Sequence, residues 1–121
     1  MDRVGVGRKD GAAGAHARGL RSTGQVVAAA VAAAFTIPIG ELHAGSRRSA
    51  EIAFARQNAM YLAHVALGLN YTDAGRAFGR DRTTAAHACR VVEDSRTDPG
   101  IDARLDSLEH LLRRGFDARV S

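Results

Sequence analysis

The sequence has no Trp, two Pro, one Cys and only 5% aromatic residues among its 121 positions. A single cysteine cannot form an internal disulfide, which fits a reducing cytosol, and we expect Cys89 to be a buried structural thiol. So few aromatic residues leave the core to small aliphatic side chains. The length allows one small domain and excludes a multidomain enzyme. With one Lys and no Gly-x-x-x-x-Gly-Lys-Ser/Thr motif, a phosphate-binding loop is excluded as well.

Alanine and arginine dominate what is present. The 24 Ala favour helices and disfavour strands, so the sequence predicts an all-α fold. Arg provides 16 of the 17 basic residues, and the net charge is +4 with a pI of about 10.2. By segment the charge is +3 over 1–22, zero over 23–40, +3 over 41–92 and −2 over 93–121. Positive charge in the middle of the chain indicates a polyanionic partner, although a GC-rich genome also produces an Arg-for-Lys bias.

The first forty residues divide into a polar and an apolar part. Residues 1–22 are rich in Gly, Ala and Arg without apolar periodicity, and we expect a disordered basic arm. Residues 26–39 carry no charge and permit two interpretations. One is a core helix capped by Ser22 or Thr23, and the other is the apolar segment of a secretory signal. The helix would direct to the core Val26, Val27, Ala30, Val31, Ala34 and Phe35.

Apolar residues recur at helical spacing in four further segments, 49–67, 72–78, 81–94 and 101–114. Ser49 is the expected N-cap of the first of these, and Gly68 is the residue expected to end it. The last is amphipathic, with acidic residues between its leucines, and is expected to cover the core. The chain therefore predicts one helical domain over 23–114 and a C-terminal tail over 115–121.

The segment 71–92, YTDAGRAFGRDRTTAAHACRVV, has the form of a helix-turn-helix. Thr72 is placed to cap its first helix and Gly79 to make the turn. The small residue Gly75 allows the two helices to cross closely. The second helix opens with Asp81-Arg82-Thr83-Thr84, the short polar and charged groups that a recognition helix presents to a major groove.

Two stretches carry a resemblance to a known family. SRRSAEIAFARQNAMYLA at 46–63 and AGRAFGRDRTTAAHACRVVE at 74–93 resemble the C-terminal DNA-binding domain, domain IV, of the bacterial chromosomal replication initiator DnaA, here without the ATPase portion. The resemblance extends from Gln25 to about Leu112, and through VAAAFTIPIGEL it favours the core helix over the secretory signal. It implies a compact helix-turn-helix fold, similar to that of the Trp repressor, that binds double-stranded DNA.

The resemblance implies DNA contacts from three places. A basic loop sends Arg48 into the minor groove, with Arg47 beside it. The long helix holds phosphates through Arg56 and Gln57. The recognition helix meets bases and flanking phosphates through side chains that can accept from cytosine or touch thymine methyl groups. The members of that set are Asp81, Arg82, Thr83, Thr84 and His87.

Two positions depart from the family pattern. The family's two glycines before Arg-Asp are one here, Gly79, which shortens the turn by one residue. Arg82 replaces the family's His, and because Arg favours bidentate contact with guanine, we expect a different base preference. No metal site is expected, since His87 and Cys89 lie two residues apart on a helix and point in different directions.

These features predict a cytoplasmic, nucleoid-associated bacterial protein that binds double-stranded DNA sequence-specifically. Its expected role is the regulation of transcription, or of replication at initiator-type sites. No enzymatic activity, cofactor, nucleotide or membrane association is expected. The main alternative is a protein-interaction module on the same fold, which has lost base readout and docks a protein partner through its first or last helix. A small exported protein is a weaker alternative.

Overall fold

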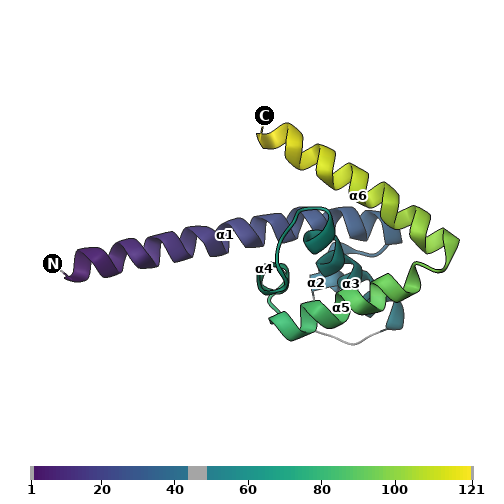
Figure 1. Cartoon of the computed structure of the whole chain (residues 1–121), viewed down its shortest axis with the longest axis horizontal. Helices are drawn as coiled ribbons and strands as arrows, with labels where there is room; N and C mark the ends of the chain where they lie inside the picture. Colours follow the sequence, from purple (N-terminus) through teal and green to yellow (C-terminus); the bar gives the residue numbers. More distant parts are fainter. Residues whose placement is uncertain (1, 44–48, 121) are drawn as a thin grey trace.

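The computed structural model describes residues 2–43 and 49–120, with side chains over 14–42 and 49–117. Within these ranges it contains helices and no strand, which confirms the all-α prediction (Figure 1). In the described part of the chain, none of the helices is long and apolar enough to cross a membrane. The helices are α1 (Asp2–Phe35), α2 (Ile39–His43), α3 (Ala50–Val65), α4 (Tyr71–Arg76), α5 (Arg82–Ser95) and α6 (Pro99–Val120).

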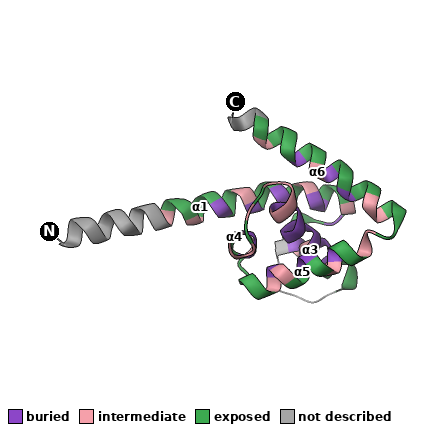
Figure 2. Ribbon diagram, in the orientation of Figure 1, coloured by how far each residue is buried: buried purple, intermediate pink, exposed green. Residues whose placement is uncertain are grey.

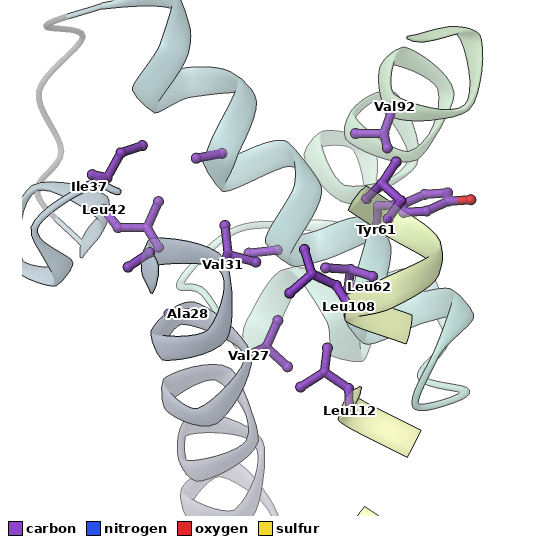
Figure 3. Close-up of a cluster of buried hydrophobic side chains, with 14 of the residues drawn as sticks. Val27, Ala28, Val31, Ile37, Leu42, Tyr61, Leu62, Val92, Leu108 and Leu112 are labelled. Atoms are coloured by element: carbon purple, nitrogen blue, oxygen red, sulfur yellow. The ribbon is translucent and has the colours of Figure 1, made fainter. Parts of the chain in front are cut away.

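The helix α3 connects the parts of the fold, because it contacts each of the other helices. Buried residues follow the faces where the helices meet, and exposed residues follow the outer faces (Figure 2). The core consists of small aliphatic side chains, as the shortage of aromatic residues predicted. In Figure 3, Val27 and Val31 of α1 lie close to Leu62 of α3 and Leu108 of α6. The largest fully buried apolar side chains are Val27, Val31, Leu62, Val92 and Leu105.

The helix α1 begins earlier than the sequence predicts. A disordered arm is expected over 1–22, whereas the structure continues α1 through this segment from Asp2. Leu20 is buried, with 6% of its surface exposed, and Gly24 packs directly against the residue that follows α4. These tertiary contacts hold α1 at Leu20 and Gly24, and the alanines of the earlier segment favour the helical conformation.

The apolar stretch 26–39 contributes a core helix. Val27 and Val31 are fully buried, but Val26 and Ala34, which the sequence also assigned to the core face, are exposed. Leu20, Gly24, Val27 and Val31 follow one another at spacings of four, three and four residues, so they define the face of α1 that meets the other helices. Val26 lies about 100° around the helix from Val27 and falls outside that face.

Capping agrees with the sequence at α3 and differs at α4. The Ser49 hydroxyl accepts a hydrogen bond from the Ile52 N–H at 3.2 Å, as predicted. The cap of α4 is Asn70 rather than Thr72, and the Asn70 Oδ1 accepts from the Asp73 N–H at 2.8 Å. Asn70 has the extended backbone that an N-cap requires, whereas Thr72 already lies inside the first turn.

The last helix is longer than predicted at both ends. It opens at Pro99, whose fixed φ suits the first helical position, and the Asp98 Oδ1 accepts the Gly100 N–H at 2.8 Å. It then continues to Val120, through most of the segment 115–121 that the sequence assigned to a tail. Phe116 gives the physical reason, because its ring is half-buried against the hydrophobic core.

Candidate nucleic-acid interface

The predicted helix-turn-helix is formed by α4, the turn that follows it, and α5. The helices cross so closely that a Cβ on Gly75 would lie 2.5 Å from the carbonyl oxygen of Asp81. Gly79 adopts a φ of 71° in the turn, a conformation that glycine reaches without strain. The Arg80 N–H donates to the Gly75 carbonyl at 2.8 Å and ties the turn to α4. The close crossing and the glycine turn are therefore confirmed.

Asp81 caps α5 at the end expected to face DNA. Its Oδ1 accepts the Thr84 N–H at 2.8 Å. This hydrogen bond lowers the pKa of the exposed Asp81 carboxyl below its usual 3.8, so the group is ionised at neutral pH. The helix dipole further favours a negative charge at this end. Arg82 and Thr83, both exposed in the first turn, thus lie beside a carboxylate whose position is set by the cap.

The helix α5 has one buried and one exposed face. Small residues on the buried face let it pack closely against α3 and α4, and these include Ala85, Ala88, Cys89 and Val92. The exposed side chains Thr83, His87 and Arg90 are spaced by four and three residues and share the opposite side of the helix. Polar and basic groups therefore continue along α5 beyond its first turn.

A cleft of about 440 Å³ lies between the start of α3 and the start of α5. It brings together Gln57 from the middle of α3, Arg80 from the turn and Thr84 from α5. Polar side chains from two distant parts of the sequence thus line one cleft beside the N-terminus of α5. Side-chain donors of these kinds, a guanidinium above all, suit an anion such as a phosphate. The cleft is lined by Ser49, Ala50, Ala53, Arg56, Gln57, Met60, Arg80 and Thr84.

Arg56 lines this cleft but is also tied to the body of the protein. Its Nε donates to the carbonyl of Leu42 at 3.0 Å, and a terminal nitrogen donates to the carbonyl of Glu41 at 3.4 Å. These carbonyls belong to the short helix α2, so Arg56 fixes α2 against α3. The guanidinium therefore has a structural function at the position where the sequence predicts a phosphate contact.

Arg80 is absent from the contacts predicted by sequence, although it is exposed and lines the cleft beside Thr84. Its place immediately before the Asp81 cap, in the Gly-Arg-Asp of the turn, was the signal that could have identified it. The predicted loop residues Arg47 and Arg48 lie outside the described residues. Ser49, the next residue, lines the same cleft.

The residues on the buried side of α5 offer little for metal or thiol chemistry. Cys89 is 7% exposed, as its predicted structural role requires, and burial raises the pKa of its thiol to about 11. Among the described residues, no group of three or more His, Cys, Asp or Glu side chains could hold a metal ion.

Known proteins are similar to this chain in both sequence and fold. The DnaA of Laribacter hongkongensis is 38% identical over 85 residues, and that of Nitrosomonas eutropha is 41% identical over 85 residues. Each alignment covers 69% of this chain and 18% of the relative, so the chain spans about a fifth of their length. A crystal structure of a DNA replication initiation factor superposes with a TM-score of 0.69 and 25% identity, over 92% of this chain and 32% of that one.

The match to the family described as the bacterial dnaA protein helix-turn-helix covers residues 25–92, more than half of the chain. These residues run from α1 through most of α5 and include the cleft, the turn and the exposed face of α5 described above. The chain therefore belongs to the bacterial DnaA helix-turn-helix family of DNA-binding domains.

Proposed function

We propose that this protein binds double-stranded DNA sequence-specifically, with the start of α5 in a major groove, and regulates transcription or replication at initiator-type sites. The observation that carries the proposal is the start of α5, where the capped carboxylate of Asp81 lies beside the exposed side chains of Arg82 and Thr83. Carboxylate, guanidinium and Thr methyl are groups that distinguish cytosine, guanine and thymine at the floor of a major groove.

We further propose that contacts with backbone phosphates position the start of α5 on the duplex. In our proposal the side chains of Gln57, Arg80 and Thr84 hold a backbone phosphate in the cleft. His87 and Arg90 continue the contact along the exposed face of α5. Arg47 and Arg48 remain the expected minor-groove contacts.

The regulatory role rests on the match to one region of the relatives. They are named chromosomal replication initiator proteins, and the chain aligns with less than a fifth of their length. A domain that occupies initiator-type sites can compete with an initiator or control a neighbouring promoter. We propose this mode of action, in which binding itself is the regulatory event.

Selection of bound duplexes from a random pool tests sequence-specific binding. We expect a consensus to emerge, and a selected duplex to compete for the protein far better than a scrambled duplex of the same length. Thr83→Ala should weaken binding to the consensus, whereas Arg114→Gln, an exposed change on α6, serves as the control. Equal binding to all duplexes, or none, would contradict the proposal and favour a protein-interaction module.

A further inference from the structure

The helix α1 is seated directly on the helix-turn-helix. A Cβ on Gly24 would lie 2.2 Å from the carbonyl oxygen of Ala77, so the two backbones touch. One turn earlier Leu20 is buried, and a further turn back the His16 Nε2 lies 3.5 Å from the Asp73 Oδ1. Figure 1 shows α1 running past α4. These contacts set the position of α1 beside the turn that leads into α5.

This packing places two arginines from separate elements around one hollow. Arg21 of α1 and Arg76 of α4 line a cavity of about 350 Å³ together with Gln25, and the turn residues Phe78 and Gly79 complete its wall. Both arginines are exposed, and no described acidic residue lines the cavity. The two guanidinium groups repel each other, and an anion bound between them would offset that repulsion.

The donors in the hollow come from side chains. The backbone N–H groups of Phe78 and Gly79 already donate to the carbonyls of Gly75 and Arg76, at 3.0 and 3.1 Å. Two guanidinium groups and the amide of Gln25 therefore supply the available N–H donors of this wall. Guanidinium forks match the oxygens of a phosphate and are the side chains best suited to hold one.

We propose that Arg21, Gln25 and Arg76 bind a backbone phosphate of duplex DNA, outside the groove entered by α5. The turn links this hollow to the cleft, since Gly79 lines the hollow and Arg80, the next residue, lines the cleft. In this proposal a DNA strand held at Arg80 continues to Arg21 and Arg76. The inference rests on the proposed function and extends the DNA interface onto α1.

Binding assays with Arg21→Gln, Arg76→Gln and the double variant test this inference. Arg114→Gln removes the same charge from α6 and is the control for each single variant. On a duplex with long flanks, the double variant should bind about tenfold more weakly, with a salt dependence of log K shallower by about 1, as expected for one lost phosphate. Base preference should stay unchanged, because the affected contact is to the backbone. Thermal melting checks that the variants fold.

A second experiment varies the length of the duplex. Trimming the flank on the side of α1 should abolish the difference between wild type and double variant, and trimming the other flank should preserve it. Equal affinity and equal salt dependence of both proteins on the long duplex would overturn the inference. So would saturation of the hollow by inorganic phosphate, in a chemical-shift titration, without any effect of the double variant on duplex binding.

The same data separate this inference from the proposed function. If wild type binds all sequences alike but the double variant still loses salt dependence, the hollow is a phosphate site and sequence-specific binding fails. If wild type selects a consensus and the double variant behaves as wild type, sequence-specific binding stands and the hollow is not a phosphate site. Absence of any DNA binding by wild type overturns both.

Discussion

At the scale of single residues, Arg82 is the position most informative about base preference. It is exposed in the first turn of α5, beside the carboxylate of Asp81, and it stands where the resembling family has His. An arginine at this place reaches the O6 and N7 acceptors of a guanine, which a shorter His side chain cannot contact in the same way. Replacing this one side chain should therefore change the preferred DNA sequence.

We expect Arg82→His to reduce the preference for guanine at one major-groove position by about 1–3 kcal/mol, the range of a bidentate contact. Competition between the selected site and a duplex substituted at that position measures the change in both proteins. Arg114→Gln should leave the ratio unaltered. An identical ratio for wild type and Arg82→His would show that Arg82 contacts the backbone or the solvent instead.

Cys89, in contrast to the exposed Arg82, is buried in the fold. Because burial raises its pKa to about 11, the thiol stays protonated in the folded protein at pH 8. We expect it to react with a thiol reagent far more slowly in the native protein than in urea, where the pKa returns to its usual range. Reaction rates measured from pH 7 to 10 check this, and equal native and denatured rates would contradict it.

At the scale of helices, Arg96 joins the end of α5 to α6. Its guanidinium donates to the Asp102 and Asp106 carboxylates at 2.5 Å each, to Glu109 at 2.7 Å and to the Tyr61 hydroxyl at 2.9 Å. Only 16% of the Arg96 side chain is exposed. Burial acts to lower the pKa of Arg96, but the carboxylates outweigh it and the net pKa is raised, so the side chain remains charged.

Removing this charge should loosen α6. Arg96→Gln leaves three neighbouring carboxylates without their common partner, and we expect the free energy of unfolding to fall by about 2 kcal/mol. The value lies below that of a fully buried pair because Asp102 and Asp106 are exposed to solvent. Urea denaturation measures the change, with Arg114→Gln, an exposed change on α6 itself, as the control. Equal midpoints would assign the position of α6 to its leucines alone.

At the scale of the whole molecule, positive charge collects around the helix-turn-helix. Arg56 and Arg80 line the cleft, Arg90 lies on the exposed face of α5, and Arg21 and Arg76 line the hollow beyond the turn. The acidic residues of α6 are instead engaged by Arg96. The net charge of +4 is thus unevenly distributed, with the cations where we propose the DNA to lie.

We expect log K for a long duplex to fall with log salt at a slope of about −4, since each phosphate neutralised contributes about −0.9. The groups expected to take part include Arg47, Arg48, Arg76, Arg80 and Arg90. Titrations of a fluorescent duplex between 50 and 300 mM salt, roughly the range in which such slopes are measured, provide the value. A slope near zero would contradict DNA binding altogether.

Features that depend on nearby residues were predictable from sequence. The all-α fold follows from its alanines, and the Ser49 cap, the Gly79 turn and the cap at Asp81 each depend on residues within a few positions. The site residues of α5 lie in one continuous motif, so the resemblance could assign them from sequence, and their contacts with DNA stay a prediction. Arg80 belongs to that motif too, but only the cleft shows its position beside Thr84.

The sequence alone determined the helices of the segments 49–67, 72–78, 81–94 and 101–114 and the order of the helix-turn-helix, since helical spacing, capping and turn conformation are local properties. Only the tertiary structure decided that Leu20 and Gly24 of α1 and Phe116 of α6 pack against the rest of the domain, because each is held by residues distant in the chain. It also decided that Arg21 and Arg76 share one hollow. They are 55 positions apart, and no periodicity relates residues brought together by the packing of one helix on another.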